Sequence, residues 1–189
     1  MKKITLFLFV TLLFSSSSVY SQSKFEKVLR DIFTAVKESN YKLLNVGYQT
    51  LTVNSATNIG GHTREFFKLT LPEGTKKYAL RVTVIPIKSN FQYEPDETLF
   101  ALMQKSNAKE VYAPQDKGID LYIMNRSFEA DAFVNKGNFK VVKEYPNYNS
   151  FVDQIDSEAG NYWIGVKNPN SMNGLKAIIE IVAIGNFNN

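Results

Sequence analysis

The sequence has no cysteine, a single histidine and one tryptophan among its 189 residues. Without cysteine there is no disulfide framework and no thiol to carry a lipid anchor, so a packed core must hold the fold together. One histidine without a thiol leaves only carboxylate oxygens as metal ligands, which disfavours transition metals. These absences exclude cysteine nucleophiles and disulfide-stabilised folds.

The one histidine, His62, is the only side chain that could serve as the base of a Ser-His-Asp arrangement. It lies in the turn sequence 60–63, just before a predicted strand, and no Gly-x-Ser-x-Gly motif accompanies it. The Gly60-Gly61 pair precedes a strand and not a helix, so it does not resemble a phosphate loop either. We interpret His62 as a solvated turn residue and predict no catalytic residue and no enzyme activity.

Charge is nearly balanced along the chain. There are 22 Lys and Arg against 18 Asp and Glu, and Lys2 and Lys3 account for two of the excess positive charges. The lysines alternate with acids and form no cluster or stripe that could follow a phosphate backbone. The sequence therefore predicts no nucleic-acid partner.

The N-terminus contains the only long apolar run, Ile4 to Phe14, which follows two lysines and precedes the serine cluster Ser15 to Ser18. A basic start, a short apolar segment and small residues at the cleavage site are typical of a signal peptide. We expect residues 1–21 to be removed after Ser21 and the chain to be exported to the periplasm or the exterior. No later segment is apolar enough to predict a membrane span in the mature form.

The clearest predicted helix covers Ser23 to Ser39. Ser23 and Glu26 form a capping-box sequence at its start. Its apolar stripe consists of residues at helical spacing: Phe25, Val28, Leu29, Ile32 and Val36. Such a stripe needs a surface to cover it, so the domain is expected to comprise this helix, residues 22–40, and a body at 41–189.

From Tyr41 onward the apolar period changes to two, and β-branched and aromatic residues are punctuated by Asn, Gly and Pro. This pattern predicts short strands joined by turns. For example, Phe67, Leu69 and Leu71 alternate with polar residues before a turn at Pro72. The predicted strands are Glu65–Leu71, Lys77–Val84, Ile119–Met124, Asn138–Val142, Tyr148–Ile155, Asn161–Lys167 and Leu175–Ile184.

Only one further helix is predicted, over Asp96 to Ser106, with Asp96 as its cap and Leu99, Leu102 and Met103 on one face. It lies inside Phe91 to Gly118, the least regular stretch, which we interpret as a long connection. With few helices among many strands, the chain does not fit a doubly wound parallel fold. The prediction is a mainly β protein: an antiparallel, jelly-roll-like β-sandwich.

Some predicted strands are apolar on both faces. In the last one, Ile178 and Val182 lie opposite Ala177 and Ile179, so each face offers apolar groups. At about 25 cal/mol per Å² of apolar surface, covering the outer face stabilises the fold far more than a surface ion pair does. We therefore expect the N-terminal helix to lie across the outer face of one sheet.

Four segments resemble the bacterial pre-peptidase C-terminal domain: Glu65 to Gly74, Tyr78 to Val84, Gly118 to Ile123 and Gly160 to Val166. The resemblance covers about Tyr41 to Ile184, while the helix in front and the long connection before Asp120 depart from the family pattern. It implies a jelly-roll-like sandwich, found on secreted proteins, that assists export, binding or substrate contact and is not itself catalytic.

The densest acidic patch contains Asp153, Asp156 and Glu158 at the end of a predicted strand. Carboxylates at such a turn can hold a hard cation such as calcium, although the spacing differs from that of an EF-hand loop. The alternative is a solvated strand end. No other cofactor is predicted.

Aromatic residues offer the second candidate site. Tyr145 and Tyr148 flank Pro146 and Asn147 in a predicted turn, and Trp163 lies on a strand face. Exposed rings on a sandwich can stack on sugars or anchor a protein partner, whereas buried rings only fill the core or lie beneath a helix. For Trp163 the buried alternative is favoured.

The sequence therefore favours a non-enzymatic secreted or periplasmic binding module for a protein or a polysaccharide. The alternative is a structural or accessory subunit of a cell-envelope complex, which would receive its partner on an exposed sheet edge or on the connection Phe91 to Gly118. A hydrolase comes third.

Overall fold

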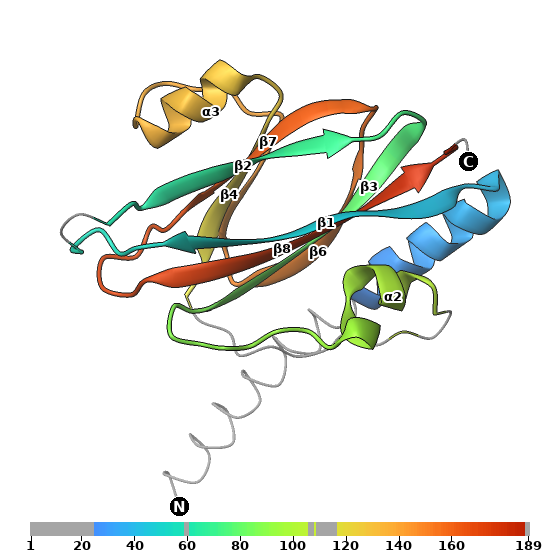
Figure 1. Cartoon of the computed structure of the whole chain (residues 1–189), viewed down its shortest axis with the longest axis horizontal. Helices are drawn as coiled ribbons and strands as arrows, with labels where there is room; N and C mark the ends of the chain where they lie inside the picture. The colour runs from blue at the N-terminus through green and yellow to red at the C-terminus, as the bar shows by residue number, and fades with distance from the viewer. Residues whose placement is uncertain (1–24, 59–60, 106–107, 109–116, 188–189) are drawn as a thin grey trace, which may run out of the picture.

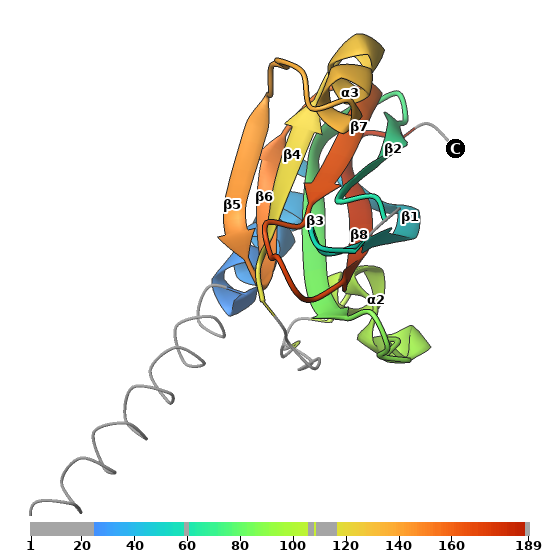
Figure 2. The same cartoon turned by 90° about the vertical axis from the view of Figure 1, so that its left-hand side faces the viewer.

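The computed structural model describes residues 25–58, 61–105, 108 and 117–187. Two four-stranded antiparallel sheets pack face to face, with helices on their outer sides (Figure 1, Figure 2). Within this part of the chain, no helix has the length and apolar character that crossing a membrane requires. The predicted signal peptide and Ser23 of the predicted capping box lie outside the described residues.

The first sheet has the strand order β1-β8-β3-β6 and the second the order β2-β7-β4-β5. Strands that follow one another in the chain mostly lie in opposite sheets, which is the arrangement of an eight-stranded jelly roll. The predicted fold class is confirmed. The strand bounds are β1 Lys42–Val53, β2 Arg64–Leu71, β3 Thr75–Pro86, β4 Ile119–Met124, β5 Lys143–Tyr148, β6 Ser150–Asp156, β7 Gly160–Lys167 and β8 Leu175–Gly185.

Alternate residues of both sheets fill the space between them. In β3, for example, Tyr78, Leu80 and Val82 face this core, and Ala79 and Arg81 face the other way. From the second sheet the core receives buried residues of β2, β4, β5 and β7: Leu69, Leu71, Ile119, Leu121, Ile123, Tyr145, Ile164 and Val166.

The outer face of the first sheet carries the N-terminal helix, which is described over residues 25–39. Phe25, Leu29 and Ile32 of its apolar stripe are buried in one cluster with Ala79 of β3 and Val182 of β8. The expected placement of this helix across one sheet is thereby confirmed. The reason is the one that the sequence suggests, since β8 is apolar on both faces and needs a second layer.

A helix that the sequence analysis missed, α3 (Ser127–Val134), packs on one end of the outer face of the second sheet (Figure 2). Its Phe133 is buried against Met124 of β4, and Trp163 of β7 packs on the same cluster. The predicted strand Asn138–Val142 is wrong, because these residues form the irregular return from α3 to β5. Their Phe139 packs on the α3 cluster, so its alternating pattern reflects local packing and not a sheet.

The predicted turn at Tyr145 to Tyr148 is also wrong, because these residues belong to strand β5. Pro146 is compatible with a strand here because β5 is at the edge of its sheet, where one side needs no backbone donor. The turn lies instead around Asn149 and divides the predicted strand Tyr148–Ile155 between β5 and β6.

The connection between β3 and β4 contains a 3₁₀ turn, η1 (Pro95–Glu97), and the short helix α2 (Leu99–Met103). α2 lies within the predicted helix Asp96–Ser106 and η1 overlaps its start, while Ser106 is outside the described residues. The predicted cap is wrong: Thr98, and not Asp96, accepts a hydrogen bond from the Ala101 backbone at the start of α2.

Strand β1 changes sides at a bulge between Asn45 and Gly47. Before the bulge, Leu43 packs on the outer cluster beneath the N-terminal helix. After it, Leu51 and Val53 face the core between the sheets. An extra residue in one strand shifts the alternation in this way, so one strand contributes to two layers.

A candidate binding cleft beside strand β1

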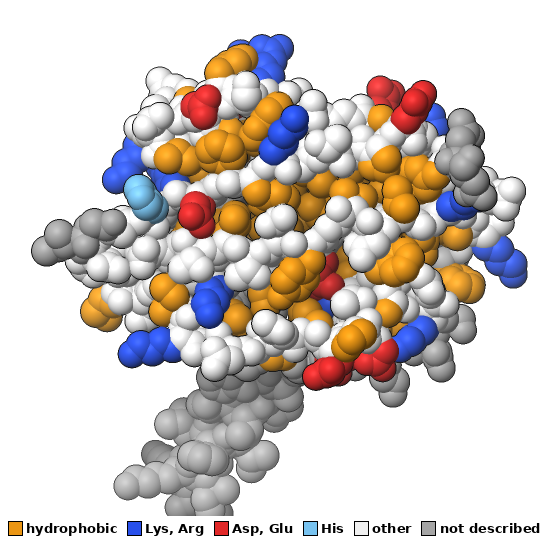
Figure 3. All heavy atoms as spheres, in the orientation of Figure 1, with side chains coloured by type: hydrophobic (Ala, Val, Ile, Leu, Met, Phe, Trp, Pro, Cys, Tyr) orange, Lys and Arg blue, Asp and Glu red, His pale blue; other side chains and the backbone are white. Residues whose placement is uncertain are grey.

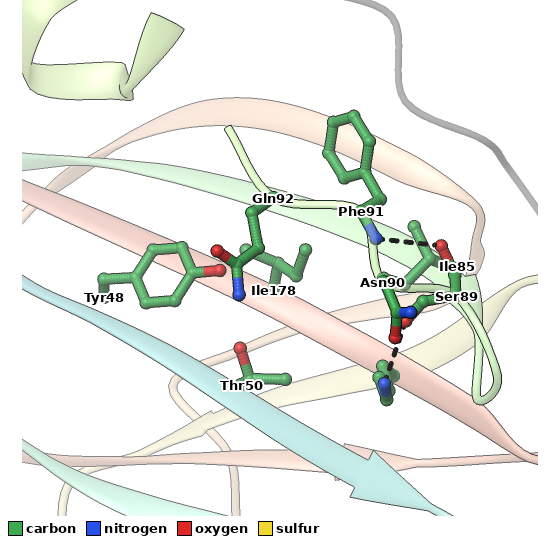
Figure 4. Close-up of a pocket in the computed structure, with 9 residues that line it drawn as sticks. Tyr48, Thr50, Ile85, Ser89, Asn90, Phe91, Gln92 and Ile178 are labelled. Carbon is green, nitrogen blue, oxygen red and sulfur yellow. Dashed lines mark hydrogen bonds between the residues drawn. The ribbon is translucent and has the colours of Figure 1, made fainter. Parts of the chain in front are cut away.

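A cleft of about 260 Å³ lies on the outer face of the first sheet, at the opposite end of that face from the N-terminal helix. One side of it is strand β1, and the other is the connection that follows β3 (Figure 4). Its lining residues are Tyr48, Thr50, Ile85, Ser89, Asn90, Phe91, Gln92, Lys176 and Ile178.

The floor of the cleft is apolar and its β1 side is polar. Ile85 of β3 and Ile178 of β8 are each 1% exposed and point outward from the sheet into the cleft. Because of the bulge, Tyr48 and Thr50 project to the same outer side. The Tyr48 ring remains 46% exposed, and in Figure 4 its hydroxyl end points toward Gln92.

Hydrogen bonds hold the opposite wall of the cleft to the sheet. The Ile87 backbone N–H donates at 3.2 Å to the carbonyl of Gly174, the residue before β8. The Lys176 ammonium donates to the Ser89 carbonyl at 2.9 Å, and the Phe91 backbone N–H donates to the Ser89 hydroxyl at 3.2 Å. The wall therefore has a defined position relative to the floor.

A buried ion pair fixes the next part of the connection. Arg81 of β3 and Glu180 of β8 are 3% and 4% exposed, and the Arg81 Nε donates to the Glu180 carboxylate. Arg81 Nη2 also donates to the Glu97 carbonyl at 2.8 Å, and the Leu99 backbone N–H donates to Glu180 Oε1 at 2.8 Å. The Arg81 guanidinium lies 3.7 Å from the centre of the Tyr93 ring.

This pair couples the sheet to the wall of the cleft. Removing one partner of a buried ion pair leaves the other charge unpaired away from water, at a cost of about 3–5 kcal/mol. Both partners also bind the backbone between residues 97 and 99, so the connection cannot leave the sheet without exposing the pair. The sheet thus positions Asn90 and Gln92, which the same connection carries.

Some polar groups of the cleft are bonded within the fold and others are not. Asn90 and Gln92 are exposed, and in the described part of the chain no residue hydrogen-bonds their side-chain amides. The charged residue of the lining is Lys176, whose ammonium already bonds Ser89. The cleft therefore offers an aromatic ring, neutral donors and acceptors, and an apolar floor.

A second pocket of about 220 Å³ lies on the other side of β1, between the two sheets. Its walls come from β1, β2 and β8, and Figure 3 shows hydrophobic side chains gathered between β1 and β2 on this side of the molecule. Its apolar lining residues are Val46, Phe67, Leu69, Ile179 and Ile181, and its polar ones are Gln49, Lys68 and Thr70.

The predicted aromatic site is not assembled. Tyr145 is 5% exposed and faces the core between the sheets, whereas Trp163 packs beneath α3 on the opposite face of the second sheet. Tyr148 is 37% exposed, with its ring 5.9 Å from that of Tyr145. The structure thus brings the two tyrosines together and separates them from Trp163. Ligand binding by these residues stays a prediction.

The predicted calcium ligands point in different directions. Asp153 lies on the inner side of β6, where it accepts hydrogen bonds from Lys143 Nζ and from the Tyr145 hydroxyl, each at 2.8 Å. Asp156, three residues later, faces the other side and lies 3.2 Å from Lys77 Nζ. Among the described residues, no group of three acidic or histidine side chains is placed to hold a metal ion.

These contacts perturb two titrating groups at the β5–β6 edge. Burial alone would raise the pKa of Asp153, but the hydrogen bonds from Lys143 and Tyr145 outweigh it and lower the pKa below its ordinary value. Burial, together with the bond to Asp153, raises the pKa of Tyr145. Asp153 is therefore an ionised structural group at neutral pH.

His62 is exposed in the connection between β1 and β2, where its backbone carbonyl accepts the Asn54 N–H at 2.8 Å. Its ring has no hydrogen-bond partner among the residues that the structure describes. This placement matches the solvated turn residue that the sequence suggests.

The chain matches no protein-family model and no curated protein. Solved structures that align with it include the pre-peptidase C-terminal domain of a collagenase from Bacillus anthracis, at 9% identity, covering 72% of this chain and 89% of that one, with a TM-score of 0.37. The C-terminal CBM6 of the laminarinase LamC from Zobellia galactanivorans aligns at 10% identity, over 75% and 98% of the two chains, with a TM-score of 0.32.

A third aligned structure is PliG from Aeromonas hydrophila, a periplasmic inhibitor of g-type lysozyme, at 8% identity. The alignment covers 76% of this chain and 85% of that one, with a TM-score of 0.31. The family that the sequence resembles is thus among the structural neighbours. At this level of similarity none of their ligands or site residues carries over to this chain.

Sequence reasoning missed the cleft because its residues come from three separate segments without a motif. Tyr48 and Thr50 belong to β1, which the sequence analysis did not outline, and residues 89–92 belong to the connection. One signal was present in the sequence: Tyr48 follows Gly47, which interrupts the alternation, and precedes Thr50 by two residues.

Proposed function

We propose that this chain is a non-enzymatic, exported binding module that takes a segment of a polysaccharide in the cleft between β1 and the connection after β3. The observation that carries the proposal is the pairing of the half-exposed Tyr48 ring with the unbonded amides of Asn90 and Gln92 over an apolar floor. Export rests on the predicted signal peptide at residues 1–21.

The chemistry of the cleft matches a sugar chain. An exposed tyrosine ring offers an apolar surface on which the C–H face of a sugar can stack, and its hydroxyl stays available for a hydrogen bond. Asn and Gln amides both donate and accept, as sugar hydroxyls do. Because none of the described residues that line the cleft brings a free carboxylate or ammonium, a neutral glycan fits better than a charged one.

The size of the cleft supports a polymer and not a free small molecule. Its volume of about 260 Å³ lies below the usual range of sites that enclose a small ligand, roughly 300–1,000 Å³. Such a site would contact a few units of a longer chain, while the rest of the polymer stays in solvent.

A glycan array probed with the exported form, followed by calorimetric titration of the best polysaccharide, tests this function. Tyr48→Ala is expected to weaken binding at least tenfold, because the stacking surface is lost, and Gln92→Ala severalfold. Tyr148→Ala is the matched control, since it removes a comparably exposed tyrosine from the opposite edge. If Tyr148→Ala weakens binding and Tyr48→Ala does not, the cleft is the wrong site. If no polysaccharide is retained, the proposed function is wrong.

A further inference from the structure

Strand β1 has a free edge whose unpaired stretch can be located by the backbone bonds around it. In the described part of the chain, β1 lies at the end of its sheet and pairs only with β8. Residues of an antiparallel strand direct their N–H and C=O groups alternately to the two sides. The Thr52 N–H donates to Glu65 Oε2 at 3.2 Å and the Asn54 N–H to the His62 carbonyl, both away from β8.

By the same alternation, the backbone groups of Tyr48 and Thr50 also face away from β8. Within the described residues, neither N–H has a partner, whereas the next two outward N–H groups along the strand are taken. Both residues are exposed. The open stretch is therefore short, and it is bounded by the bulge at Gly47 on one side and by the Glu65 bond to Thr52 on the other.

This stretch lacks the usual protection against strand pairing. Natural sheet edges are blunted by charged side chains, proline or bulges. Residues 47–52 read Gly-Tyr-Gln-Thr-Leu-Thr and contain neither a charge nor a proline. The other end of the strand carries such devices, since Lys42 precedes the bulge.

A pocket lies on each side of the open stretch. On the outer side, Tyr48 and Thr50 border the candidate cleft. On the inner side, Gln49 borders the pocket between the sheets, whose walls include Phe67 and Ile179. A strand placed beside β1 would direct its side chains alternately toward these two pockets, as its own pleat requires.

We propose that the edge of β1 at residues 48–50 accepts an extended segment of a partner protein, which adds a short antiparallel or parallel strand to the first sheet. The occupant is polypeptide because only a peptide backbone presents N–H and C=O groups at the spacing of the open edge. Its inward residues are apolar, to fill the pocket lined by Val46 and Leu69, and its outward residues are polar. This proposal does not rest on the proposed glycan function, although the outward residues of the added strand would border the same cleft.

The probe is the peptide Thr-Val-Thr-Val-Thr-Val-Thr, compared with the same peptide N-methylated on alternate residues of one backbone edge. N-methylation removes donors and keeps every side chain, so it separates strand pairing from non-specific apolar contact. Amide hydrogen exchange is measured residue by residue on the exported chain. The unmodified peptide is expected to slow exchange of the Tyr48 and Thr50 amides at least tenfold, and the methylated peptide to leave it unchanged.

Two variants complete the test. Thr50→Pro removes the central edge donor and should abolish the protection at Tyr48. Thr50→Lys keeps the donor, places a charge on an exposed position that tolerates it, and should weaken peptide binding severalfold. Polysaccharide binding is measured on the same protein. If the peptide pairs with β1 but no polysaccharide binds, the proposed function is wrong and the proposal for the β1 edge still stands.

Three outcomes would overturn the proposal. Equal binding of the two peptides would show that the backbone edge is not used. Protection confined to β6 or β5 would place the accepting edge elsewhere. Slow exchange at Tyr48 and Thr50 that grows with protein concentration, without peptide, would show that a second copy of this chain is the occupant.

Discussion

The two edges of the sandwich, β5–β6 and β1–β2, are built differently. At the β5–β6 side, Tyr145 stacks on Phe151 with ring centres 4.4 Å apart, and Asp153 binds both Tyr145 and Lys143. At the β1–β2 side, the bond from Thr52 to Glu65 joins strands across a gap that holds the second pocket. One side is closed by rings and a charge network, and the other is left partly open.

The β5–β6 side mainly stabilises the fold, whereas the β1–β2 side contains the candidate binding surfaces. Two residues of the predicted aromatic site, Tyr145 and Tyr148, pack with Phe151 and close the sandwich on the side away from the cleft. The cleft, the second pocket and the unpaired stretch of β1 all lie on the open side. Changes on the closed side should therefore lower stability, and changes on the open side should mainly alter binding.

The largest expected effect is at Phe151. Phe151→Ala removes a ring that is 7% exposed and packs on two tyrosines, so it should lower the free energy of unfolding by about 3–5 kcal/mol. The matched change on the open side is Phe67→Ala, where the ring is only half-buried beside the pocket and the expected loss is about 1 kcal/mol. Urea unfolding of both variants measures the difference, and equal losses would contradict the contrast.

Asp153 should give the next largest effect. Asp153→Asn weakens the hydrogen bonds from Lys143 and Tyr145. It is expected to lower the free energy of unfolding by about 1.5 kcal/mol, which is typical of hydrogen bonds to charged groups. Asp156→Asn is the control, because Asp156 pairs with Lys77 while its side chain is 84% exposed, and little change is expected.

The cost of Asp153→Asn should also depend on pH. The pKa of Asp153 is lower in the folded chain than in the unfolded chain, so its stabilisation is complete above the unfolded pKa of about 3.9 and is lost as pH falls through the folded value. The difference in the free energy of unfolding between wild type and Asp153→Asn should therefore be constant near neutral pH and shrink below about pH 4. A difference that persists unchanged at lower pH would show that packing, and not charge, holds this side.

The smallest effect is expected at Gly47. A Cβ at this position would have no neighbour within 4 Å among the described residues, and the φ of Gly47 is not positive. Gly47→Ala should leave the free energy of unfolding unchanged or raise it by about 0.5–1 kcal/mol, since it restricts the unfolded chain. The same change at Gly165 should destabilise, because a Cβ there would lie 2.8 Å from the Phe133 ring. Thermal unfolding distinguishes the two, and a marked loss at Gly47 would mean that the open side is packed after all.

The elements that could be predicted are those in which one pattern dominates. β2, β3, β7 and β8 are uninterrupted runs rich in β-branched and aromatic residues, and the N-terminal helix has a clear apolar stripe, so their type follows from the sequence. β1 was not outlined because its bulge reverses the alternation at Asn45 to Gly47. β5 was assigned to a turn because Pro146 and Asn147 favour turns, and only the edge position makes them compatible with a strand.

The candidate site could not be predicted for a different reason. Tyr48 and Gln92 are 44 residues apart in number, and nothing local relates them. They meet because β8 places Ile178 and Lys176 between β1 and β3, and because Arg81 and Glu180 hold the connection down. The site therefore depends on the order of the strands in the sheet, which local residue patterns do not specify.

Because of its bulge, β1 should not tolerate a change in its number of residues. Removing one residue between Asn45 and Gly47 would restore a single alternation and turn Leu43 away from the N-terminal helix, toward the core between the sheets. Inserting several residues into the 54–63 connection would disturb no layer. Variation in chain length should therefore be tolerated in that loop and rejected a few positions earlier.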